Sequence, residues 1–80
     1  MTDAKVGDIK YYHDSGDIFK VEVLDVQERA YGKTIGEEYK LRLLEVVYTN
    51  AKNRPTSGLE FAVWKVKDVG AYAGWHLLDR

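Results

Sequence analysis

The sequence predicts one small all-β domain, and the main observation behind this is a period-two alternation of apolar and polar residues. Residues 19–23 and residues 39–43 both alternate in this way. A second observation is that the alternating segments are rich in valine and aromatic residues, which favour strands. Apolar residues do not recur at the spacing of an amphipathic helix. We therefore expect strands rather than helices.

The alternation changes phase inside both segments. The apolar positions shift by one residue at 23–24, and the same shift occurs at 43–44. A phase slip within a strand requires a bulge or a sharp bend. The sequence therefore predicts that the second and third strands are long and bent, as strands are when they wrap a small barrel. The alternative is that each is two shorter strands, but no Gly or Pro interrupts either run.

Weaker patterns predict the other strands and the connections. The first, fourth and fifth strands are expected at residues 6–12, 59–64 and 75–78. A tight hairpin turn is expected at residues 14–17, where Gly16 suits a positive φ. Residues 29–38 and 50–58 are polar and contain Gly or Pro, so we expect two long loops there.

At the level of the fold, the chain resembles the SH3-like small barrels, a superfamily of chromatin, ribosomal and signalling modules. The resemblance rests on five short strands in 80 residues, on the bent second and third strands, and on two short motifs. These motifs are Val6-Gly7-Asp8 at the entry and Gly74-Trp75-His76-Leu77 as the closing strand. The resemblance implies a single five-stranded β-barrel domain over residues 1–80. An OB-fold is the alternative, but residues 50–58 are too short and polar for the helix it usually needs.

The amino-acid composition excludes several classes of protein. The chain is 45% hydrophobic and 31% charged, with a net charge of −1 and no cysteine. This balance excludes a disordered chain, argues against a generic basic nucleic-acid coat protein, and removes disulfides and thiolate zinc sites. No apolar run approaches the length of a membrane helix, and no apolar signal region follows the N-terminus. We expect a cytoplasmic protein without membrane contact.

Motifs for catalysis or metal binding are incomplete. Gly32-Lys33-Thr34 looks like the end of a phosphate-binding loop, but Gln27 stands where that loop needs a glycine and no helix is expected to follow. His13 and His76 could approach each other if the first and last strands paired, yet a metal site needs three or more ligands.

No nucleophile has the setting that catalysis requires. Ser15 lies in a turn and Ser57 in a loop, and neither has the strained context of a catalytic serine. Glu37 and Glu38 are best explained as a solvated edge. We expect no enzyme activity, no cofactor and no metal site.

Aromatic residues give the first functional hypothesis, a non-catalytic module that binds a protein partner or associates with itself. Tyr11 and Tyr12 are adjacent on one strand, so one of them should face outward. Trp64 is opposite in phase to its apolar neighbours, and small residues surround Tyr72 and Trp75. The alternative is that both tryptophans close the ends of the barrel. The expected contact residues are Tyr12, Trp64, Tyr72 and Trp75, together with an open sheet edge.

Basic residues in the two long loops give the alternative hypothesis, a nucleic-acid-binding barrel. If both loops lay at one end, their positive charges and nearby tyrosines could hold a phosphate backbone. Acidic residues share this neighbourhood, so a mixed solvated surface is the simpler interpretation. The residues concerned are Arg29, Tyr31, Lys33, Tyr48, Lys52 and Arg54.

Overall fold

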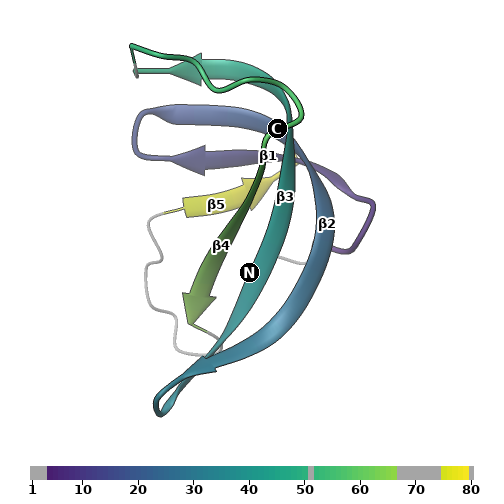
Figure 1. The fold of residues 1–80 in the computed structure, drawn as a ribbon, viewed down its shortest axis with the longest axis vertical. Helices are drawn as coiled ribbons and strands as arrows, with labels where there is room; N and C mark the ends of the chain where they lie inside the picture. The colour runs from purple at the N-terminus through teal and green to yellow at the C-terminus, as the bar shows by residue number, and fades with distance from the viewer. Residues whose placement is uncertain (1–3, 51, 67–74, 80) are drawn as a thin grey trace.

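Five strands form one antiparallel sheet in the computed structural model, which describes residues 4–50, 52–66 and 75–79 (Figure 1). The strands are β1 (Ile9–Asp14), β2 (Asp17–Tyr31), β3 (Thr34–Thr49), β4 (Glu60–Val66) and β5 (Trp75–Leu78). Their order across the sheet is β4-β3-β2-β1-β5. The first four strands therefore form a meander, and the fifth returns to lie beside the first. Among the described residues, no helix has the length and apolar character that crossing a membrane requires.

Both predicted phase slips are confirmed as irregularities in the pairing of β2 with β3. Val23 and Asp25 pair with successive residues of β3, so Leu24 is left out of the register. Lys20 and Val21 pair with Glu45 and Leu43, and this leaves out Leu44 in the same way. Both strands are continuous and visibly curved in Figure 1, so the alternative of two shorter strands is wrong.

The long loop expected at residues 29–38 is instead the end of a β-hairpin. β2 continues to Tyr31 and β3 begins at Thr34, so only Gly32 and Lys33 connect them, with Gly32 at a φ of 62°. The last five residues of β2 are all exposed. Because this part of the hairpin buries neither face, no apolar alternation marks it as a strand in the sequence. The tight turn expected at residues 14–17 is confirmed, with Gly16 at a φ of 80°.

The core lies on the inner, concave face of the curled sheet. Its fully buried side chains are Val21, Val23, Tyr39, Leu41 and Leu43. Trp75 and Leu77 of β5 cover them from the other side, and Phe19 and Phe61 pack at the margin. The Trp75 ring contacts the Tyr39 ring edge to face, with centroids 5.8 Å apart. The Lys65 ammonium lies 5.7 Å from the Trp75 ring centroid, where its charge is attracted by the aromatic face.

The sheet is not closed into the predicted barrel. β4 and β5 are its two edges, and within the described chain they do not pair with each other. A side chain joins them, because the indole N–H of Trp75 donates a hydrogen bond to the Trp64 carbonyl at 3.2 Å. Strands that pair lie only about 4.8 Å apart. Among the described residues, a hydrogen bond from a side chain therefore connects β4 with β5 in place of a backbone ladder, and β5 does not complete the barrel.

Candidate functional site

Two of the four residues expected to contact a partner are core residues. Tyr12 and Trp75 are each only 6% exposed, so the predicted exposure of both is wrong. The Tyr12 ring packs against Phe19, Phe61 and Trp75, with centroids 5.5–6.1 Å away. Alternation along β1 requires one of two adjacent tyrosines to face inward, and Tyr12 is the one in register with buried Leu77. Tyr72 lies outside the described residues.

Trp64 lies on the outer face of β4, as its phase predicts. It pairs with Glu38 of β3, and its ring covers the backbone of Gly36. The indole N–H donates to the Arg29 carbonyl at 3.1 Å. Gly36 is required here, because a Cβ at this position would meet the Trp64 ring and the Lys65 carbonyl.

Tyr31 completes an aromatic pair at the end of the β2–β3 hairpin. Its ring meets the Trp64 ring edge to face, with centroids 5.1 Å apart at 86°. Tyr31 remains 55% exposed. The Arg29 guanidinium is held 3.2 Å from the Glu38 carboxylate, and about half of its side chain is exposed. We call Arg29, Tyr31 and Trp64 the hairpin-tip cluster.

From the sequence, Trp64 was assigned to a protein-binding surface, whereas Arg29 and Tyr31 were assigned to a nucleic-acid-binding surface. The structure brings the three residues together. Trp64 is 33 residues from Tyr31 in the chain, and their contact depends on the register of β4 against β3. Gly36 was expected to be a loop glycine and was missed as a structural residue. A glycine inside a strand can indicate that another group approaches its backbone closely. This is the one feature of the sequence that could have indicated the contact between Gly36 and Trp64.

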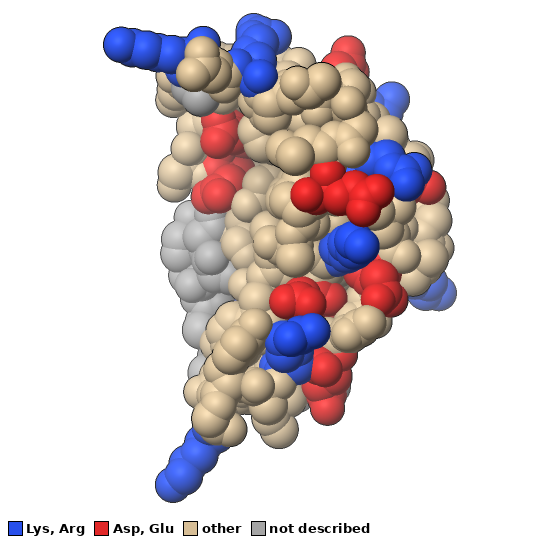
Figure 2. Space-filling model, viewed as in Figure 1, with Lys and Arg blue, Asp and Glu red and all other residues tan. Residues whose placement is uncertain are grey.

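The two groups of basic residues do not form one patch. Arg29, Tyr31 and Lys33 lie at the hairpin end of β3, whereas Tyr48, Lys52 and Arg54 lie at or beyond its other end. These ends are the two extremes of the longest axis, which is 36 Å (Figure 1). Figure 2 accordingly shows Lys and Arg side chains projecting at both extremes. The single phosphate-binding surface considered from the sequence is therefore not assembled.

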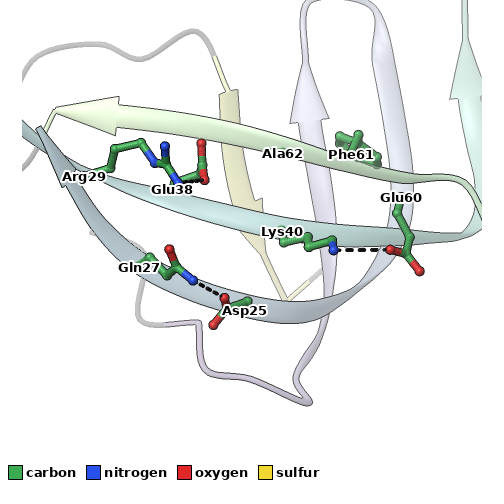
Figure 3. Close-up of a pocket in the computed structure, with 8 residues that line it drawn as sticks. All are labelled: Asp25, Gln27, Arg29, Glu38, Lys40, Glu60, Phe61 and Ala62. Atoms are coloured by element: carbon green, nitrogen blue, oxygen red, sulfur yellow. Dashed lines mark hydrogen bonds and ion pairs between the residues drawn. The ribbon is translucent and has the colours of Figure 1, made fainter. Parts of the chain in front are cut away.

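Charged side chains of alternating sign cover the outer face of β2, β3 and β4 between these extremes (Figure 2). A shallow depression of about 410 Å³ lies among them. Figure 3 shows that its charged side chains are engaged with one another: Arg29 with Glu38, Lys40 with Glu60, and Gln27 with Asp25. Arg42 extends this ladder by contacting both Glu22 and Glu60 at 3.4 Å. The lining residues are Asp25, Gln27, Arg29, Glu38, Lys40, Glu60, Phe61 and Ala62.

Breaking this ladder will have a small effect on stability. The Arg42 side chain is 42% exposed, and the acids it contacts are 33% and 42% exposed. Ion pairs this exposed contribute about 0–1 kcal/mol each. We expect Arg42→Met to lower the free energy of unfolding by less than about 1 kcal/mol in urea titration. A loss above about 3 kcal/mol, the size reached when a buried pair is broken, would contradict this assignment.

The two histidines are brought together, because β1 pairs with β5 and places His13 directly opposite His76. They border a second depression with Asp17, Ile18 and Tyr48. No group of three metal-ligating side chains forms within the described residues.

The residues considered for catalysis have structural contacts. The Ser15 amide donates to the Asp14 carboxylate, and the Ser57 hydroxyl donates to the Leu44 carbonyl at 3.1 Å. Gly32, Lys33 and Thr34 form the hairpin turn and the start of β3. The described acceptor of the Ser57 hydroxyl is a backbone carbonyl, which is not a general base.

Comparison of the chain with protein-family models, curated protein sequences and solved structures finds no match. Function is therefore argued from geometry and chemistry alone.

Proposed function

We propose that the chain is a non-catalytic interaction module that binds a protein partner through the hairpin-tip cluster. The observation that carries this proposal is the pair formed by exposed Tyr31 and half-buried Trp64, with Arg29 beside it, at the end of a hairpin that projects from the sheet (Figure 1). Tyrosine, tryptophan and arginine are the residue types most enriched among those that dominate binding energy in protein interfaces.

The cluster is held in place before any partner arrives. The Trp64 ring is fixed by its hydrogen bond to the Arg29 carbonyl and by its packing on Gly36, and it supports the Tyr31 ring in turn. The guanidinium of Arg29 is oriented by Glu38. Binding a partner then requires little further ordering of these side chains, and this lowers the entropic cost of association.

The fold-level resemblance to SH3-like small barrels belongs to the same proposal. Its support is the set of five strands, the bent β2 and β3, and the position of β5 beside β1. On a small scaffold of this kind, function depends on the side chains that its loops and hairpin ends expose. In this chain, the exposed side chains of the hairpin-tip cluster favour a binding role.

Replacing Tyr31 by alanine will weaken partner binding by about 2 kcal/mol, or about thirtyfold in Kd, because the exposed ring at the centre of the contact is lost. The measurement has two steps. Proteins retained by the immobilised wild-type chain are first compared with those retained by Tyr31→Ala and by Tyr48→Ala. A protein lost with the first variant is then purified, and its Kd is measured for all three chains.

Tyr48→Ala is the matched control, because Tyr48 is also about half exposed but lies at the opposite end of β3. Equal losses of affinity for both variants would contradict the proposal. Self-association is tested in parallel by sedimentation equilibrium. A dimer that Tyr31→Ala dissociates would identify the partner as a second copy of the chain.

Nucleic-acid binding is the competing proposal, and it predicts a different pattern. Affinity for a mixed single-stranded oligonucleotide would fall steeply with salt and would drop in Lys52→Ala and Arg54→Ala. Because the structure separates these residues from Lys33, we expect no such binding at moderate salt. Salt-sensitive binding that is lost in both variants would move nucleic acid to first place.

A further inference from the structure

An apolar groove of about 260 Å³ lies on the inner face of the sheet, at the end opposite the hairpin-tip cluster. Tyr12, Phe19 and Phe61 form an aromatic wall, in which the Tyr12 ring meets Phe19 nearly parallel and Phe61 edge to face. Leu59 borders the groove and is 49% exposed despite being apolar. The full lining is Tyr12, Asp14, Asp17, Phe19, Leu43, Pro55, Leu59 and Phe61.

Two carboxylates stand at the rim of this groove. Asp14 and Asp17 are direct partners across the β1–β2 turn, so both side chains lie on one face of the sheet. Their hydrogen bonds come from neutral groups: Tyr12 and the Ser15 amide for Asp14, and the Thr49 hydroxyl for Asp17. Within the described chain, no Lys, Arg or His lies within ion-pair distance of either carboxylate. Like charges directly opposed on paired strands destabilise each other.

Tyr12 links the carboxylates to the aromatic wall. Its hydroxyl donates to Asp14 Oδ2 at 3.0 Å. Burial raises the pKa of Tyr12 well above its usual value, and the hydrogen bond to Asp14 and the charges of Asp14 and Asp17 raise it further. Tyr12 therefore stays neutral and holds the Asp14 carboxylate at the rim with one face toward the groove.

We propose that this groove binds an arginine side chain of a protein partner. The aromatic wall and Leu59 would cover the methylene stem and one face of the guanidinium, and Asp14 and Asp17 would receive its N–H groups. A cation between the two carboxylates also removes their mutual repulsion. This site is separate from the hairpin-tip cluster, because Asp17 and Tyr31 are the two ends of β2.

The volume of the groove and the two carboxylates at its rim together favour an arginine side chain as the ligand. Pockets for drug-sized molecules span about 300–1,000 Å³, and this groove is smaller, so it suits one side chain. A planar guanidinium with five donors can reach two carboxylates and stack on a ring at the same time. A lysine ammonium offers a compact point charge and no plane to stack. Net neutral or acidic side chains would leave the two carboxylates uncompensated.

The test is an amide-resolved NMR titration of the whole 80-residue chain with a capped Leu–Arg–Leu tripeptide. The comparison ligand carries citrulline in place of arginine, which keeps the shape and removes the charge. We expect shifts confined to residues 12–19, Leu43 and residues 55–61. The Kd should be at least about tenfold lower for the arginine peptide, or about 1.4 kcal/mol. Raising the salt concentration should weaken binding of the arginine peptide only.

Asp17→Asn should weaken arginine-peptide binding about tenfold, whereas Asp25→Asn on the outer face is the matched control and should not. Thermal unfolding verifies that both variants fold. Leu59→Ala should also weaken arginine-peptide binding, independently of the charges, because it removes exposed apolar surface from the groove. Equal affinity for both peptides, or equal effects of the two Asp variants, would overturn the proposal. Tyr31→Ala should leave this binding unchanged, so the two sites succeed or fail separately.

Discussion

Replacing Trp75 by alanine will lower the free energy of unfolding by about 3–5 kcal/mol, the usual cost of truncating a large buried aromatic residue. The ring is 6% exposed and contacts both Tyr12 and Tyr39. Its N–H is also the described link between the two edges of the sheet. A domain of this size has a total stability of only about 4–12 kcal/mol, so the substitution removes at least about a quarter of it. Urea unfolding followed by circular dichroism measures the loss.

Trp75→Phe separates packing from the hydrogen bond to β4. It keeps an aromatic ring in the core and loses the indole N–H, so we expect a loss smaller than that of the alanine variant, on the order of 1–3 kcal/mol. If Trp75→Ala remained within about 0.5 kcal/mol of the wild type, as surface substitutions do, the assignment of this ring to the core would be contradicted.

Replacing Gly36 by alanine will destabilise the chain by about 1–3 kcal/mol, as overpacking does at a filled position. The sign is informative, because alanine is normally better than glycine inside a strand by about 0.5–1 kcal/mol. Here the added Cβ would meet the Trp64 ring and the Lys65 carbonyl, so the ring must leave its place. Urea unfolding gives the energy, and a red-shifted tryptophan emission reports the exposure of Trp64.

A double-mutant cycle assigns this effect to the ring. Combining Gly36→Ala with Trp64→Ala removes the ring but leaves the Lys65 carbonyl, so the two losses should be less than additive by at least about 0.5 kcal/mol. A neutral or stabilising Gly36→Ala with unchanged emission would show that the Trp64 ring does not rest on this glycine.

Much of the fold could be predicted from the sequence where one face of a strand is buried. The phase slips at residues 23–24 and 43–44 are visible because the apolar side chains must keep facing the core on both sides of a bulge. The end of the β2–β3 hairpin could not be found in the same way, because its residues are exposed on both faces. Closure of the barrel depends on how closely β4 and β5, which are distant in the chain from each other's partners, approach at the two edges, and no local pattern encodes this.

The candidate site could be predicted only in part, for a related reason. Alternation shows that Tyr11 and Tyr12 face opposite ways and that Trp64 opposes Val63, but the inward side is fixed by pairing with other strands. For Trp64 the deduction succeeds, since the buried phase of β4 is clear. For Tyr12 it fails, since Tyr11 and Tyr12 must face opposite ways but have the same character.

Site-specific photo-crosslinking shows whether the hairpin-tip cluster contacts a protein partner. A crosslinking phenylalanine analogue is placed at Thr34, which pairs with Tyr31, and in a separate chain at Thr56, in the β3–β4 connection at the other end of the molecule. Both are exposed. We expect that the Thr34 chain crosslinks to a defined protein in cells, that the Thr56 chain does not, and that adding Tyr31→Ala abolishes the product. Crosslinking at Thr56 with none at Thr34, or a product that persists in Tyr31→Ala, would contradict the proposal.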